Sequence, residues 1–239
     1  MEISKGIEII DLGLKIGRIL VVADLHIGFE ESLNRQGMMI PRFHLKDMTE
    51  RLEKMIRRAK PDTIIVNGDI KHEMGTISDQ EWRETLKVLE LLARNSKKVI
   101  LIKGNHDKIL GPIARKKDID IVESYEIKEK GILILHGHKE INIPRGIKTI
   151  IIGHEHPAVA LKEGERSERF KCFLKGRYKG KDLIVLPSFN LLTEGTDILK
   201  EGVLSPFLKK QNLDSFEAFV VSDKIYNFGK LKDIERYNR

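Results

Sequence analysis

Seven of the eight histidines lie in or just after short polar clusters that also hold aspartate and asparagine. In an Asp-x-His or His-x-His segment both side chains point to the same side of an extended chain, so each pair can reach one ion. These donors are carboxylate and amide oxygens and imidazole nitrogens, without a thiolate. Such a set is typical of a site for Mn²⁺, Fe or Zn²⁺ and differs from a thiolate-rich structural zinc site. The clusters are Asp24-Leu25-His26, Asn67-Gly68-Asp69 followed by His72, Gly104-Asn105-His106-Asp107, His136-Gly137-His138 and Gly153-His154-Glu155-His156.

Each cluster directly follows a predicted buried strand, at residues 19–23, 64–66, 99–103, 132–135 and 149–152. In open α/β sheets the carboxyl ends of the strands form the crevice in which ligands bind. Five strand ends are therefore expected to converge on one place.

Strands and amphipathic helices alternate in the first half of the chain. Apolar runs at 18–23, 62–66 and 98–103 are separated by a helical pattern over 42–60 and by a helix that Ser78 would cap, with Glu81 completing a capping box. This order predicts a mostly parallel sheet with right-handed crossovers. The second half has closely spaced strand patterns at 125–128, 131–135, 148–152, 158–162, 169–178 and 182–186, and a terminal hairpin of 216–222 with 224–228.

These patterns predict an α/β (α+β) fold, a two-sheet mixed β sandwich flanked by helices, with residues 1–239 as a single domain. The chain is 41% hydrophobic and 33% charged, which describes a globular protein. Its apolar runs are too short to span a bilayer, and residues 1–18 lack the features of a signal peptide. Cys172 is the single cysteine, so no internal disulfide can form and a reducing cytoplasm is expected.

The net charge of +7 favours an anionic partner such as nucleic acid. In the stretch 169–181 basic residues alternate, and they would share one face of an extended strand that could track a phosphate backbone. A solvated surface of a Lys-rich protein would look the same, and the abundance of Lys, Glu and Ile is typical of heat-adapted organisms. The candidate substrate-binding residues of this stripe are Arg169, Lys171, Lys175 and Arg177, with Lys179 and Lys181 continuing it.

The five clusters, in this order, resemble the motifs of the calcineurin-like metallophosphoesterases over residues 19–157, with a continuation at 186–190 (LPSFN). The resemblance implies two divalent ions about 3.5 Å apart that activate a water for in-line attack on phosphorus. Mn²⁺ is the expected ion, with Fe, Zn²⁺ and Ni²⁺ as alternatives. Asp24, His26, Asp69 and His156 would hold the first ion, and Asp69 would bridge to a second ion held by Asn105, His136 and His154.

The resemblance also implies catalytic roles near the ions. His106 would protonate the leaving oxygen or stabilise the transition state, because an imidazole can act as an acid at neutral pH. Asp107 would orient His106 by a hydrogen bond, and Gly104 would let the backbone turn sharply there. His72 is a further catalytic candidate and His138 a substrate-binding one, with a merely local structural role as the alternative for both.

A narrower resemblance comes from Gly68-Asp69-Ile70-Lys71-His72 and from "VVADLHIGFE". These are similar to SbcD-type DNA-repair nucleases, above all to small archaeal SbcD-related phosphoesterases, and to bacterial metallophosphoesterases associated with DNA ligases. The resemblance implies a nuclease on single-stranded or structured DNA, with DNA favoured over RNA. The chain ends where the repair nucleases add a DNA-capping domain, which argues against processive duplex degradation.

Three alternatives stay open. The protein could be a phosphatase or cyclic-nucleotide phosphodiesterase for small molecules, or a non-catalytic scaffold, although scaffolds lose ligands that this sequence retains. It could also be a partner-dependent subunit of a DNA-repair complex, or form a homodimer. No membrane partner is expected.

Overall fold

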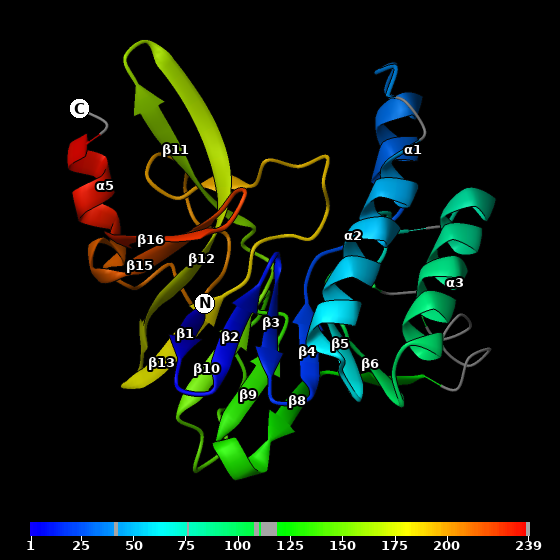
Figure 1. The fold of residues 1–239 in the computed structure, drawn as a ribbon, viewed down its shortest axis with the longest axis horizontal. Helices are drawn as coiled ribbons and strands as arrows, with labels where there is room; N and C mark the ends of the chain where they lie inside the picture. The colour runs from blue at the N-terminus through cyan, green and yellow to red at the C-terminus, as the bar shows by residue number, and fades with distance from the viewer. Residues whose placement is uncertain (41–42, 76, 108–109, 111–118, 238–239) are drawn as a thin grey trace.

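Two mixed β-sheets stack in the computed structural model, which describes residues 1–40, 43–75, 77–107, 110 and 119–237 (Figure 1). The first sheet begins as an antiparallel meander and continues as parallel strands. Its strands, in spatial order, are β1 (Glu2–Ser4), β2 (Ile7–Ile10), β3 (Gly13–Ile16), β4 (Ile19–Val22), β5 (Thr63–Asn67), β6 (Lys98–Ile102) and β7 (Asp120–Val122).

The second sheet has a parallel centre with antiparallel strands on both sides. The long strand β12 leaves the body of the sheet with β11 as a projecting hairpin (Figure 1). The order is β14 (Thr196–Asp197), β11 (Pro157–Glu163), β12 (Arg166–Tyr178), β13 (Lys181–Val185), β10 (Thr149–Ile152), β9 (Ile132–Leu135) and β8 (Ser124–Ile127), and β15 (Glu217–Val221) joins β12 to β16 (Ile225–Lys230).

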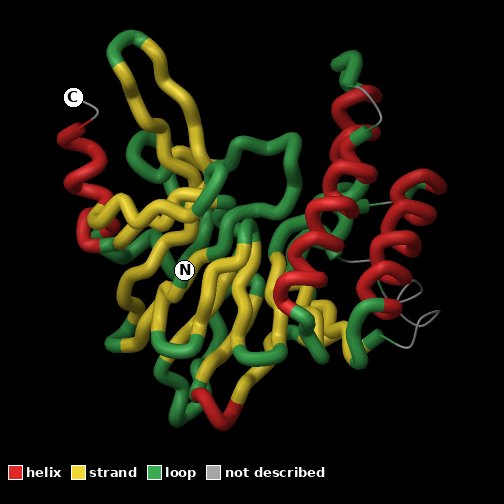
Figure 2. The backbone as a smooth tube through the Cα atoms, in the orientation of Figure 1, coloured by secondary structure: helices red, strands yellow, loops and turns green. Residues whose placement is uncertain are grey.

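Two long helices pack on the outer face of the first sheet (Figure 2). They are α2 (His44–Ala59) and α3 (Asp79–Arg94), whose apolar faces join the same buried cluster as β4 and β5. The shorter elements are α1 (Phe29–Arg35), α5 (Leu231–Tyr237) and the 3₁₀ turns η1 (Lys128–Lys130) and η2 (Leu213–Ser215). Among the described residues, no helix has the length and apolar character needed to cross a bilayer.

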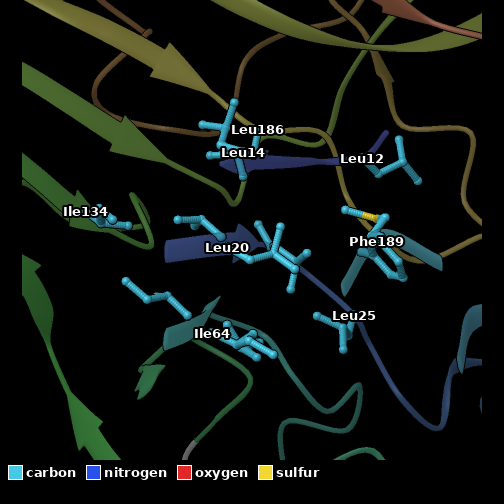
Figure 3. Close-up of a cluster of buried hydrophobic side chains, with 14 of the residues drawn as sticks. Leu12, Leu14, Leu20, Leu25, Ile64, Ile134, Leu186 and Phe189 are labelled. Atoms are coloured by element: carbon cyan, nitrogen blue, oxygen red, sulfur yellow. The ribbon is translucent and has the colours of Figure 1, made fainter. Parts of the chain in front are cut away.

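The main core fills the space between the two sheets and continues between the first sheet and the helices α2 and α3 (Figure 3). Alternation along the second sheet assigns every other residue to this core: Ile134 of β9, Ile151 of β10 and Ile184 of β13 face it. Their neighbours in sequence face a second core on the other side of that sheet. There the segment 198–216 and α5 cover the sheet with Phe207, Leu208, Phe216, Leu231 and Ile234, all buried.

The predicted fold class and the βαβαβ order are confirmed, and the predicted strands of the second half match the observed ones within a few residues. The hairpin of β15 and β16 is also confirmed. The expected capping box forms only in part: Ser78 Oγ accepts a hydrogen bond from Glu81 N–H at 3.0 Å, but the Glu81 carboxylate turns away to the amides of His72 and Glu73. Sequence analysis did not predict β1, β2, β3, β7, β14, α1 or α5.

Candidate metal centre

The five predicted clusters meet at the carboxyl ends of β4, β5, β6, β9 and β10. Six of the seven predicted ligands fall into two groups in which the possible ligand atoms lie within 4.8 Å of one another. One group is Asp24, His26 and His156, and the other is Asp69, His136 and His154.

In the first group the potential ligand atoms are close together. Asp24 Oδ1 lies 3.4 Å from His156 Nε2, and the Nε2 atoms of His26 and His156 are 3.3 Å apart. Asp24 is fully buried, and its Oδ1 has no hydrogen-bond partner among the described residues. A buried carboxylate oxygen without a partner is costly, and a cation would satisfy it.

In the second group, His136 is oriented by the backbone. Its Nδ1 lies 3.3 Å from the carbonyl oxygen of Asn67, and because a carbonyl only accepts, Nδ1 carries the proton. Nε2 then faces the other candidate ligands, 3.3 Å from Asp69 Oδ2 and 3.1 Å from Asn105 Oδ1. Asn105, the seventh predicted ligand, is therefore also in place.

Asp69 lies between the two groups. Its Oδ2 is 3.3 Å from His136 Nε2 in the second group and 3.9 Å from His26 Nε2 in the first. Its Oδ1 accepts the backbone N–H of His106 at 2.9 Å. One oxygen of Asp69 thus lies within 4 Å of an imidazole nitrogen of each group.

The ligand loops adopt backbone conformations that only glycine takes readily. Five predicted ligands have positive φ: Asp24 (55°), His26 (45°), Asp69 (43°), His154 (67°) and His156 (50°). Such residues persist only where the surrounding structure holds them, and they concentrate at functional sites. Here backbone hydrogen bonds link the loops, for example from His26 N–H to Asp69 O at 2.9 Å.

Glycines allow the loops to approach the ligands. A Cβ on Gly68 would lie 2.0 Å from His136 Nδ1, and one on Gly153 would lie 2.6 Å from Asp24 Oδ2. A Cβ on Gly104 would lie 2.0 Å from Asp69 Oδ1. The sharp turn expected at Gly104 stays a prediction, since its φ is not positive; the structure shows that this position needs space beside Asp69.

The segment 188–190, seen in the sequence only as a continuation of the motifs, fixes the loop of Asp24 and His26 from the opposite sheet. Ser188 Oγ donates to the carbonyl oxygen of Asp24 at 2.7 Å, and Asn190 Nδ2 donates to that of His26 at 3.2 Å. Lys171 Nζ in turn donates to the carbonyl oxygens of Ser188, at 2.8 Å, and of Asn190. Ser188 and Asn190, polar residues a few positions after the apolar strand β13, are the sequence signal that could have identified this support.

Burial and neighbouring charges give the candidate histidine ligands different protonation states. Burial lowers the pKa of His26 to about 3 and that of His154 to about 4, so both rings are neutral, the form that binds a metal. Burial also acts on His136, but Asp69 and Asp24 outweigh it and raise the pKa of His136 to about 9. A proton and a cation thus compete for the lone pair of His136 Nε2, and an ion that binds there releases the proton.

His106 and Asp107 are arranged differently from the prediction. Among the described residues the Asp107 carboxylate makes no hydrogen bond to the His106 ring: it is buried and accepts the backbone N–H groups of Ile70 at 3.1 Å and Gly104 at 2.9 Å. His106 is oriented by a hydrogen bond between its Nδ1 and the carbonyl oxygen of His72. Asp107 therefore shapes the loop that carries Asn105 and His106, and it orients His106 only through the backbone.

A cavity of about 210 Å³ opens beside the first ligand group. His106 Nε2 lies 3.9 Å from Asp69 Oδ2 at its edge, and the rings of His72 and His106 are 5.7 Å apart. His138 lies on the other side, with its ring 5.2 Å from that of His136. The cavity is lined by His26, Phe29, His72, His106, His156, Asn190 and Thr193.

Glu155, which the sequence analysis did not count as a ligand, points away from the two groups. Its carboxylate accepts the backbone N–H groups of Leu204 and Ser205, at 3.0 and 2.7 Å. Ser205 Oγ also donates to the carbonyl oxygen of Gly137 at 2.8 Å. The segment around residues 204–205 is thereby attached to the loops that carry His136, His154 and His156.

The predicted basic stripe lies on β12 but does not extend to residue 181, because the chain turns at Lys179-Gly180. Arg169 pairs with Glu201 at 2.8 Å, and Arg177 pairs with Asp182. Lys171 is committed to the segment 188–190, as described above. Lys175 lies between them on the strand, partly exposed. The stripe is thus divided among local contacts, and its role in substrate binding stays a prediction.

The donor set fits divalent cations. Two carboxylates, one amide oxygen and four imidazoles face one another, and Asp24 Oδ1 has no other partner in the described part of the chain. No thiolate is present among these donors, which favours Mn²⁺, Fe or Zn²⁺ in a catalytic setting.

The family of the chain is shown by a sequence comparison. A family model described as calcineurin-like phosphoesterase matches residues 17–216. The crystal structure of Pseudomonas putida nuclease MPE is similar with a TM-score of 0.62 and 21% identity, over 91% of this chain and 92% of that one. YfcE, a phosphoesterase from E. coli, aligns with a TM-score of 0.44 and 16% identity, over 89% and 97%. No curated protein sequence matches the chain.

Metal binding should stabilise the fold measurably. At an ion concentration about 100 times Kd, binding contributes about 2.7 kcal/mol, which corresponds to a rise in Tm of about 5–10 °C for a chain of this size. We expect Mn²⁺ to raise the Tm of the wild type and to have little effect on Asp69→Asn in calorimetric scans. Asp197→Asn is the control, because Asp197 is equally buried but belongs to neither group. An undiminished shift in Asp69→Asn would contradict the shared position of this carboxylate.

The space beside Asp69 gives a second test. Gly104→Ala would place a Cβ 2.0 Å from Asp69 Oδ1 and 2.4 Å from its backbone nitrogen, so the ligand must move. We expect a loss of about 1–3 kcal/mol in the free energy of unfolding, together with weaker Mn²⁺ binding by titration calorimetry. In Gly202→Ala the added Cβ meets nothing within 4 Å, and both quantities should stay near the wild-type values. Equal behaviour of the two variants would refute the steric argument.

Proposed function

Because the chain belongs to the calcineurin-like phosphoesterase family, we propose that it is a dinuclear phosphodiesterase that cleaves single-stranded or structured DNA. Family membership makes it a metal-dependent phosphoesterase. The two-ion site, the preference for diesters and the DNA substrate are the proposal. The observation that carries it is the position of Asp69 Oδ2, between His136 Nε2 at 3.3 Å and His26 Nε2 at 3.9 Å.

The ligands divide as the two groups suggest. Asp24, His26 and His156 would hold one ion, Asn105, His136 and His154 the other, and Asp69 both. When bound, the ions would supply positive charge to the phosphate and lower the pKa of a water so that it attacks phosphorus. Two carboxylates do not neutralise two divalent cations, so an anionic phosphate would be attracted.

His106 is placed to donate a proton to the leaving oxygen. Its Nδ1 faces the carbonyl oxygen of His72, so Nδ1 is protonated and Nε2 is the atom that exchanges a proton with substrate. Nε2 lies 3.9 Å from Asp69 Oδ2, at the edge of the cavity beside the candidate ligands. The backbone N–H of His106 bonds to Asp69 as well, which links the acid to the shared ligand.

Two further observations support nucleic acid as the substrate. The net charge of +7 favours a polyanion. A nuclease from Pseudomonas putida shares the fold over 92% of its own chain. A cytoplasmic location is part of the proposal, since the single cysteine, Cys172, is buried and unpaired. Association with a second copy of the chain or with partners in DNA repair is also part of the proposal.

The role of His106 can be tested with three substrates. We expect the Mn²⁺-loaded wild type to hydrolyse bis(p-nitrophenyl) phosphate and labelled single-stranded DNA faster than p-nitrophenyl phosphate. In His106→Ala kcat should fall by about 10²–10⁴, the usual contribution of a positioned proton donor, while the metal content persists.

His44→Gln is the matched control, because His44 is a buried histidine at the start of α2 and belongs to none of the candidate ligand groups. It should keep wild-type kcat. Hydrolysis of the monoester alone would instead identify a phosphatase, and no turnover of any substrate with two ions bound would support the partner-dependent or scaffold alternatives.

Salt dependence separates a polymer substrate from a small one. DNA binding that neutralises phosphates releases counterions, so kcat/KM for single-stranded DNA should fall steeply between 50 and 200 mM salt, by about 10- to 1000-fold. For bis(p-nitrophenyl) phosphate, measured in the same buffers, kcat/KM should change little. Parallel curves for the two substrates would point to a small-molecule phosphoesterase.

A further inference from the structure

One wall of the cavity beside the candidate ligands is aromatic. Phe29, the first residue of α1, lines it together with His72 and Thr193, and His106 and His156 line it as well. The Phe29 ring is 4.6 Å from the His72 ring, at an interplanar angle of 47°. Its side chain is partly exposed to the cavity.

Phe29 does not belong to either hydrophobic core of the described chain. Other large residues of the same stretch do: Leu25 and Ile27 are buried at 0% and 1% exposure and join the main core. An aromatic side chain that lines a cavity among histidines, two residues after the core residue Ile27, offers a ring face to whatever occupies the cavity.

The position of Phe29 is fixed by the same loops that hold the ligands. Its backbone N–H donates to the carbonyl oxygen of His26 at 3.1 Å. Before it, Gly28 has φ of 92°, and a Cβ there would lie 2.9 Å from Glu81 Cγ. The Glu81 carboxylate in turn accepts the N–H of His72 at 2.8 Å. Phe29 and His72 are thus held in one connected unit with the first ligand group.

The rings that line the cavity indicate what kind of group would reach Phe29. The His72 ring lies 4.6 Å from the Phe29 ring and 5.6 Å from the His26 ring. Phe29 and His72 line the same cavity as His26 and His156, so a phosphate at the latter two and a flat ring on Phe29 would occupy one space. In a nucleotide a sugar joins the phosphate to such a ring, the base.

We propose that Phe29 is the specificity-determining residue of the site, and that it stacks on the nucleobase next to the scissile phosphate while the sugar lies over His72. The inference rests on the proposed phosphodiesterase function and deepens it by naming a nucleoside diester as the substrate class. Stacking of this kind accepts any nucleobase, because each base has a π face.

The test compares two diesters with the same leaving group and charge: thymidine 5′-(p-nitrophenyl phosphate) and methyl p-nitrophenyl phosphate. With Mn²⁺, the wild type should prefer the nucleoside ester by about 5- to 150-fold in kcat/KM, the range that base stacking on an aromatic side chain provides. In Phe29→Ala and Phe29→Leu the ratio should fall to near one, mainly through KM. Phe29→Trp should retain it.

Phe29→Leu keeps an apolar side chain and guards against loss of folding, which a Tm measurement checks. Phe228→Ala is the matched control, because Phe228 is 40% exposed on β16 and does not line this cavity. It should leave the ratio unchanged. A second readout needs no turnover: in titration calorimetry with Mn²⁺, Phe29→Leu should weaken binding of thymidine 5′-monophosphate but not of methyl phosphate.

The outcomes separate the two proposals. If the wild type hydrolyses both diesters equally, or if Phe29→Leu keeps the nucleoside preference, the inference about Phe29 is wrong and the phosphodiesterase function stands. If phenyl p-nitrophenyl phosphate shows the larger Phe29-dependent preference, the ring that stacks is an aryl ester and the nucleoside assignment is overturned. If neither diester is hydrolysed, the proposed function fails and the inference fails with it.

Discussion

The whole arrangement depends on keeping two buried carboxylates, Asp24 and Asp69, within reach of the same imidazoles. Such groups repel one another and lose their hydration, and the protein offsets this by charge. Burial acts to raise the pKa of Asp24, but His156 and His136 outweigh it and hold that pKa below its usual range. The same conflict raises the pKa of His136. Without a cation the two carboxylates are buried close together with little hydration. A bound cation would offset this cost, so the site is suited to cation binding.

The sandwich supplies the stiffness that this arrangement needs. Parallel strands β4, β5 and β6 end side by side, and so do β9 and β10 in the other sheet, so two separate sheets each contribute part of the ligand set. The core between the sheets holds them in place relative to one another, with Leu14 contributed by the first sheet and Ile134 and Leu186 by the second (Figure 3). The segment 188–190 then crosses from the second sheet to the loop of Asp24 on the first. A positive-φ backbone at five ligands can persist because it is held from both sides.

The strand ends and the candidate ligands could be predicted from the sequence, because both are marked by local patterns of residue types. Apolar runs followed by Asp-x-His or His-x-His identify strand ends and ligands together, and the structure brings all seven predicted ligands into one place. The N-terminal meander β1 to β3 escaped prediction because its strands are only three or four residues long. The helix α1 escaped as well: it has seven residues, and Gly28 before it has no capping side chain.

The sequence does not reveal which groups form hydrogen bonds with the charged residues in or near the motifs. Asp107, Glu155 and Lys171 all stand in or near patterns that suggest chemistry, yet each is used to hold backbone groups of a neighbouring loop. Their spacing is the same whether they face substrate or a peptide N–H, so only the three-dimensional contacts distinguish the two roles.

Phe29 is the opposite case, a residue whose type suggests a structural role but whose position suggests a functional one. As a phenylalanine near a strand it would ordinarily be assigned to the core, but the left-handed Gly28 turns it into the histidine-lined cavity, where its ring can contribute to recognition. In this fold the chemistry is concentrated in a few polar side chains, and the surrounding charged residues determine where those side chains stand.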